Sequence, residues 1–119
     1  RILLADDQAK VRSALRLLLE QQPEVEVLGE AVDSTGLLDW VKAACPDLVL
    51  LDWDLPGFSA MALLTLLHSL CPKLQVIVLS GRPEVRQAAL DAGANAFASK
   101  GDPPEHLLTA IDKAGREER

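Results

Sequence analysis

The sequence predicts an α/β fold, a doubly wound five-stranded parallel sheet with helices on both faces. Five short apolar runs alternate along the chain with five stretches whose apolar residues recur at helical spacing. Several of the runs contain no polar residue, which is typical of strands buried on both faces. The 119 residues show neither an internal repeat nor a linker, so a single domain with one core is expected.

The first strand is expected at Ile2 to Ala5 and ends at the acidic pair Asp6-Asp7. From Val11 to Leu19, apolar residues follow the i, i+3, i+4, i+7 pattern of an amphipathic helix, which Pro23 closes. The segment from Val25 to Val32 is less apolar and predicts a second, more exposed strand. These three elements form the first predicted βαβ unit.

The central strand is expected at Leu48 to Asp52, where an apolar run stops at an acid and the turn signal Pro56-Gly57 follows. Ser34 is the expected N-cap of the helix before this strand, and Cys45-Pro46 ends that helix. Ser59 is the expected N-cap of the next helix, which runs to about Leu70. The order of elements therefore continues as helix, strand, helix.

Two strand–helix units complete the prediction. Their strands lie at Leu74 to Leu79 and at Asn95 to Ser99, and their helices start near Pro83 and Pro104. Gly93 is expected to terminate the alanine-rich fourth helix. With right-handed crossovers, the flavodoxin-like (βα)5 strand order 2-1-3-4-5 would place the most apolar strands in the centre.

Composition excludes several classes of function. The chain has 12 basic and 18 acidic residues, a net charge of −6, so we expect no direct contact with nucleic-acid phosphates. No apolar run approaches the length of a membrane span and no signal peptide is visible, which predicts a cytoplasmic protein with no membrane contact. The chain starts without methionine and ends in a charged run, as an excised domain would.

Two further interpretations concern residues outside these patterns. Cys45 and Cys71 each precede a proline at an expected helix end and form no CxxC pair. We therefore expect two free, partly buried thiols in a reducing compartment, not a disulfide or a metal site. Met61 is expected in the core.

Four strands end in a chemically reactive residue type, and all four ends lie at one edge of a parallel sheet. These residues are Asp6-Asp7, Asp52, Ser80 and Lys100. Two carboxylates about 4 Å apart repel by about 4 kcal/mol at an effective dielectric of 20, so either a raised pKa or a divalent cation must offset the repulsion. A hard cation such as Mg²⁺, together with a lysine and a hydroxyl around one carboxylate, is suited to phosphoryl transfer onto aspartate.

These motifs carry a resemblance that covers essentially the whole chain. They are Asp6-Asp7, Leu51-Asp52 with Pro56-Gly57, Val78-Leu79-Ser80, and Gly93 to Lys100. The sequence resembles the receiver domains of bacterial two-component response regulators. Ala5-Asp6-Asp7, followed by Val11-Arg12 and a leucine-rich helix, is similar to the NarL/LuxR-type branch.

The resemblance implies that Asp52 accepts a phosphoryl group from the phosphohistidine of a sensor histidine kinase, with Mg²⁺ (or Mn²⁺) required. Asp7 would ligate the metal directly and Asp6 mainly through water. Asp52 would supply a further oxygen, and Asp54 its backbone carbonyl.

The resemblance also implies roles on the other side of the phosphoacceptor. Lys100 would pair with the phosphoryl group, Ser80 would hydrogen-bond it as the switch hydroxyl, and Phe97 would be the switch aromatic. Asp54 stands at a variable position with Arg82 across from it, and the two are expected to tune the lifetime of the acyl phosphate.

For the whole protein the resemblance implies a receiver domain at residues 1–119 that controls an output, transcription being expected. Members of the branch usually carry a C-terminal DNA-binding domain, which is absent from this chain. Beyond self-phosphorylation and autodephosphorylation at Asp52, no enzymatic activity is expected. A homodimer could form through the first and last helices, or through the fourth helix with the last strand.

Three alternatives compete with this interpretation. Asp52-Trp53-Asp54 resembles the DxD motif of haloacid-dehalogenase-type phosphohydrolases, although that motif normally opens the chain and Asp6-Asp7 would have no role. A flavin-binding flavodoxin-like module would need hydroxyls where the first loop offers carboxylates. A receiver-like interaction platform without phosphorylation is disfavoured by the full set of site residues.

Overall fold

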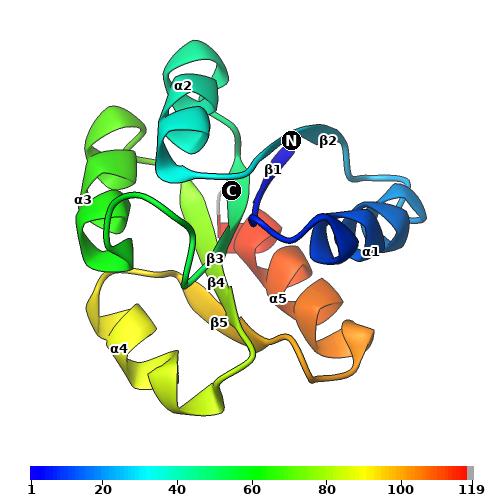
Figure 1. The fold of residues 1–119 in the computed structure, drawn as a ribbon. Coiled ribbons are helices and arrows are strands. Elements are labelled where there is room, and N and C mark those ends of the chain that lie inside the picture. Colours follow the sequence, from blue (N-terminus) through cyan, green and yellow to red (C-terminus); the bar gives the residue numbers. More distant parts are fainter. Residues whose placement is uncertain (118–119) are drawn as a thin grey trace.

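A computed structural model describes residues 1–117 and confirms the predicted class, a five-stranded parallel sheet in the order β2-β1-β3-β4-β5 between two layers of helices (Figure 1). The strands are β1 (Ile2–Ala5), β2 (Val27–Ala31), β3 (Leu48–Asp52), β4 (Gln75–Ser80) and β5 (Ala96–Ser99). The helices are α1 (Ala9–Glu20), α2 (Ser34–Ala44), α3 (Ala60–Leu70), α4 (Arg86–Asp91) and α5 (Pro104–Glu117). A short 3₁₀ turn, η1 (Pro83–Val85), precedes α4.

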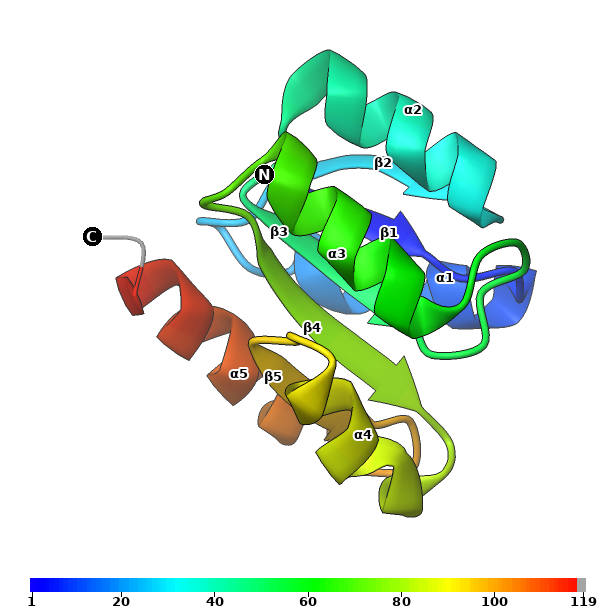
Figure 2. The same ribbon diagram turned by 90° about the vertical axis from the view of Figure 1, so that its left-hand side faces the viewer.

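The sheet separates two apolar clusters, because successive side chains of a strand point to opposite faces. Leu3, Val49 and Val76 face α2, α3 and α4 on one side, whereas Leu4 and Leu50 face α1 and α5 on the other. Figures 1 and 2 show this division of the helices between the two faces. The central strands β1 and β3 are buried along their whole length, and β2 at the edge is only partly buried.

The helix ends are mostly as predicted, with one exception. Ser59 caps α3 by accepting a hydrogen bond from the Ala62 N–H, at 3.2 Å, and Gly93 follows α4 with a φ of +111°. The prediction of Ser34 as the N-cap of α2 is wrong, because Asp33 holds that position and accepts from the Gly36 N–H at 2.8 Å. Asp33 stands one residue earlier, which frees the Ser34 side chain for the site described below.

Two other expectations are also wrong. Met61 is 64% exposed and lies on the outer face of α3, not in the core. Cys45 and Cys71 form a disulfide, with their Cα atoms 6.0 Å apart. The two cysteines end α2 and α3, which lie side by side on the same face of the sheet, so the topology brings together two residues that are 26 positions apart.

Within residues 1–117, none of the helices combines the length and the apolar character that crossing a membrane requires.

The packing of β2 against α2 yields a first prediction. A Cβ added to Gly29 would lie 2.4 Å from Cζ2 of Trp40, so Gly29→Ala must displace the indole ring. We expect this substitution to lower the free energy of unfolding by about 1–3 kcal/mol, the usual cost of overpacking. Urea denaturation measures it through the transition midpoint.

The control is Gly115→Ala in α5, where a Cβ would meet no atom within 4 Å. Because alanine is the better helix former, this variant should be more stable by about 0.5–1 kcal/mol. If both variants were equally stable, Trp40 would not constrain β2.

Candidate functional site

The register of the central strands brings the predicted acidic residues together. β1 pairs with β3 so that Ala5 lies opposite Leu51, which places the following residues, Asp6 and Asp52, beside one another at the carboxyl edge of the sheet. Both are almost completely buried, at 2% and 5% exposure, whereas Asp7 is exposed. Open parallel sheets gather their ligands at this edge.

Asp52 is held by its own loop and by the end of β5. Its Oδ1 accepts a hydrogen bond from the backbone N–H of Asp54 at 3.1 Å and lies 3.4 Å from Nζ of Lys100. Burial raises the pKa of the Asp52 carboxyl, and the charge of Asp6 adds to the rise, while the Asp54 N–H and Lys100 oppose it. The buried negative charge is therefore only partly compensated.

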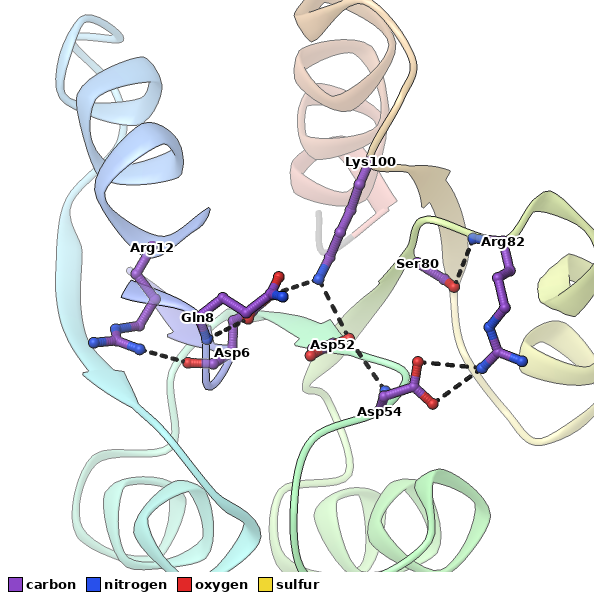
Figure 3. A network of polar contacts seen from close by, with 8 residues as sticks. All are labelled: Asp6, Gln8, Arg12, Asp52, Asp54, Ser80, Arg82 and Lys100. Carbon is purple, nitrogen blue, oxygen red and sulfur yellow. Dashed lines mark hydrogen bonds and ion pairs between the residues drawn. The ribbon is translucent and has the colours of Figure 1, made fainter. Parts of the chain in front are cut away.

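Lys100 lies between the two buried carboxylates (Figure 3). Its Nζ is 2.8 Å from Oδ2 of Asp6, closer than to Asp52. Burial lowers the pKa of Lys100, but its contacts with Asp6 and Asp52 outweigh that effect and the net shift is upward. The lysine therefore stays charged and faces two anions.

Asp6 is fixed from the side of α1. Its Oδ1 accepts from the Gln8 N–H at 2.8 Å, and its carbonyl accepts from the Arg12 guanidinium at 2.9 Å. Arg12 is itself held by Glu30 of β2, with Nε 2.8 Å from Oε1. Sequence reasoning gave Arg12 no role, although it stands in the motif quoted for the resemblance.

The other side of Asp52 carries the hydroxyl and the exposed ion pair. Ser80, at the end of β4, is 2% exposed, and its Oγ accepts from the Arg82 N–H at 3.0 Å. One guanidinium nitrogen of Arg82 contacts both carboxylate oxygens of Asp54, at 3.0 and 3.1 Å. The predicted juxtaposition of Asp54 and Arg82 is confirmed, and both side chains are exposed. Figure 3 shows the pair close to Asp52.

Ser34 supports the loop that follows Asp52. Its Oγ donates to the Pro56 carbonyl at 3.1 Å and accepts from the Phe58 N–H at 3.0 Å. Gly57, between them, has a φ of +115°, and a Cβ there would lie 2.7 Å from Ser34. The Pro56-Gly57 pair predicted the turn correctly, but the sequence did not indicate that Ser34 holds it.

A metal fits the acidic cluster. Asp6, Asp7 and Asp52 each offer a carboxylate oxygen, and these oxygens lie within 4.8 Å of one another. Oδ2 of Asp6 is buried without a hydrogen-bond donor; its contact with Lys100 is an ion pair outside hydrogen-bond geometry. A set of oxygen donors with spare lone pairs and excess negative charge suits a hard divalent cation.

Comparison with known proteins agrees with this geometry. Residues 2–112 match the family model of the response regulator receiver domain. The chain is 33% identical over 115 residues to the nitrate/nitrite response regulator protein NarL of Escherichia coli K12, covering 95% of this chain and 53% of that protein. It is 30% identical over 112 residues to the response regulator UvrY of Escherichia coli O157:H7, covering 92% and 51%. The chain thus spans about half the length of these curated relatives.

The fold is also similar to those of solved response regulators. RcsB from Salmonella enterica serovar Typhimurium, solved bound to promoter rprA in the presence of phosphomimetic BeF3-, has a TM-score of 0.87 at 27% identity, covering 97% of this chain and 59% of that one. The signal receiver domain of the putative response regulator NarL from Mycobacterium tuberculosis has a TM-score of 0.86 at 29% identity, covering 97% and 95%. None of these comparisons supports a haloacid-dehalogenase-type phosphohydrolase.

The matched family, the relatives and the fold agree with the acidic edge of the sheet described above. The chain belongs to the receiver domains of NarL/LuxR-type response regulators, which are signalling proteins and act as phosphorylation-controlled switches.

Proposed function

We propose that Asp52 is the phosphoacceptor of this domain and that a sensor histidine kinase supplies the phosphoryl group. The observation that carries the proposal is the buried Asp52 carboxylate, which has a donor on one oxygen and an acidic neighbour beside it. In the reaction a carboxylate oxygen of Asp52 attacks phosphorus, an O–P bond forms, and the N–P bond of the phosphohistidine breaks. The bonding electron pair returns to the imidazole, which takes up a proton.

Mg²⁺, or Mn²⁺, is the proposed cofactor, as receiver domains bind Mg²⁺ at an acidic pocket. Asp7 and Asp52 would hold it directly, Asp54 through its backbone carbonyl, and Asp6 mainly through water. When bound, the ion supplies positive charge that offsets the clustered carboxylates and the incoming phosphoryl oxygens. Asp6 would keep Lys100 in position while Asp52 reacts, because Nζ of Lys100 lies closer to the carboxylate of Asp6 than to that of Asp52.

Lys100 and Ser80 are the proposed partners of the phosphoryl group. Lys100 already contacts the oxygen of Asp52, so it can pair with a phosphoryl oxygen next to it. The Ser80 Oγ accepts from the Arg82 N–H, which leaves its own O–H to donate to the modified Asp52. Phe97 is 8% exposed and packs in the core beside α4, so a shift of Ser80 and Phe97 would change the surface of α4 and β5.

For the full-length protein, we propose a cytoplasmic regulator whose receiver domain, residues 1–119, controls transcription. NarL/LuxR-type response regulators are phosphorylated by sensor kinases and carry a C-terminal DNA-binding domain. The net charge of −6 supports an indirect effect of this domain on DNA, through a linked domain or a homodimer. Its dimer contacts would involve α1 with α5, or α4 with β5.

Phosphorylation is tested with a small acyl-phosphate donor. With Mg²⁺ present, we expect the intact mass to rise by one phosphoryl unit, and the modification should be absent in Asp52→Ala. Asp54→Asn is the matched control, since its carboxylate is exposed and only its backbone N–H bonds to Asp52. A phosphoryl group retained by Asp52→Ala would contradict the assignment.

Asp52 also gives a pH-dependent prediction. Folding raises the pKa of this carboxyl, so the folded protein binds the proton more tightly than the unfolded one. The stability due to the protonated form is complete at low pH and is lost as the pH rises from the ordinary value of 3.8 through the folded pKa. Without Mg²⁺, Asp52→Asn should therefore raise the Tm at neutral pH, and the gain should disappear in acid.

The matched control for this experiment is Asp39→Asn, an exposed acid on α2 that should leave the Tm profile unchanged. Mg²⁺ should raise the Tm of the unmodified domain by mass action and have a smaller effect on Asp52→Asn. A neutral-pH Tm that is lower in Asp52→Asn would show that Asp52 is not a source of electrostatic strain.

A further inference from the structure

The disulfide between Cys45 and Cys71 connects the ends of α2 and α3 on the face of the sheet away from α1 and α5. Each helix ends immediately before its cysteine, and each cysteine is followed by a proline, Pro46 or Pro72. The connected ends of α2 and α3 lie just before strands β3 and β4 begin, whereas Asp52 is the last residue of β3, at the other end of the sheet. Figure 2 shows α2 and α3 side by side along these strands. The cross-link is therefore remote from the acidic cluster.

The α2–α3 pair is fastened at both ends. At the site end, Ser34 of α2 forms three hydrogen bonds with Pro56 and Phe58 in the loop before α3, at 2.8 to 3.1 Å. At the other end the fastening is covalent, with Sγ of Cys71 also 3.8 Å from the Val41 carbonyl. Breaking the disulfide removes one of the two fastenings and leaves the other intact.

The two sulfur-bearing residues differ in accessibility and backbone conformation. Cys45 is exposed and Cys71 is 6% exposed. Cys45 also has a φ of +38°, a left-handed conformation that glycine or asparagine usually occupies at a helix C-terminus. Because Cys45 is the more exposed residue of the pair, an external thiol can approach the bond more readily from the side of Cys45 than from that of Cys71.

We propose that the Cys45–Cys71 pair is a reversible thiol–disulfide clamp that sets the stability of the α2–α3 side, with exchange entering at Cys45. A small thiolate such as that of glutathione attacks the Cys45 sulfur, forming a mixed disulfide as the Cys45–Cys71 bond breaks and Cys71 leaves as a thiolate that takes a proton. A second thiolate attacks the glutathione sulfur, giving glutathione disulfide and free Cys45. Oxidation runs the same steps in reverse, so the electrons balance.

The first test measures stability in both redox states. The disulfide closes a chain segment between residues 26 positions apart, so its reduction enlarges the conformational freedom of the unfolded chain. Reduction should lower the Tm by about 10 °C. The double variant Cys45→Ser/Cys71→Ser should have a lower Tm than the oxidised wild-type domain, and its Tm should not change when the reductant is added. An unchanged Tm in the reduced wild-type domain would overturn the proposal.

The second test measures the direction of exchange in glutathione buffers, by mass spectrometry after alkylation. Cys71→Ser should accumulate glutathione on Cys45 several-fold faster than Cys45→Ser accumulates it on Cys71. Equal rates would refute entry at Cys45, and alkylation of both cysteines in wild-type protein equilibrated with glutathione disulfide would refute the clamp.

The third test separates the clamp from the proposed phosphoacceptor. Hydrogen exchange should accelerate on reduction at the C-terminal turns of α2 and α3, while the intact mass still rises with an acyl-phosphate donor in both redox states. Faster exchange at α5 with no change at α2 and α3 would overturn the clamp. Loss of phosphorylation in both redox states would instead count against Asp52 and leave the clamp standing.

Discussion

The buried carboxylates of Asp6 and Asp52, with Lys100 as the lysine that contacts both, are the constraint on which the rest of the site depends. Pairing of β1 with β3 forces the two anions together, and their burial removes the water that would screen them. Lys100 reaches them from the end of β5, on the far side of β4 from β3. The site therefore holds two buried carboxylates against one lysine, and the proposed cation or phosphorylation of Asp52 would change this charge balance.

The helices α2, α3 and α4 cover the same face of the sheet but differ in how firmly they are held. The α2–α3 pair has Ser34 at one end and the disulfide at the other. By contrast, α4 spans six residues and buries little more than Ala89. Because few apolar contacts must be broken there, the proposed rearrangement of Ser80 and Phe97 would be directed toward α4 and β5. Under this proposal, phosphorylation of Asp52 would displace α4 and leave the α2–α3 pair in place.

Most of the fold could be predicted because it follows from local patterns. Unbroken apolar runs predicted the buried strands. Ser59 and Gly93 predicted helix ends, because the capping contacts of each involve residues within one helical turn. Predictions failed where the answer depends on partners distant in sequence. Ser34 and Asp33 are both good N-cap types, and the Pro56 loop that takes up Ser34 decides between them. The disulfide could be predicted only from the parallel packing of α2 and α3, which brings the two cysteines together. The exposure of Met61 depends on how α3 is rotated against the sheet, and the nearly all-apolar sequence of α3 does not determine that rotation.

The position of Asp54 explains why a DxD pattern need not indicate a hydrolase. In a phosphohydrolase with a DxD motif, the first aspartate attacks phosphorus and the second protonates the leaving group. The carboxyl group of the second aspartate must therefore face the reacting phosphoryl group. Here the Asp54 carboxylate is 64% exposed and contacts Arg82, and only its backbone N–H bonds to Asp52. The second acid is thus directed toward solvent and held by the Arg82 guanidinium. The Asp54 carboxylate is therefore not placed to accept a proton from a water molecule that attacks a phosphoryl group on Asp52.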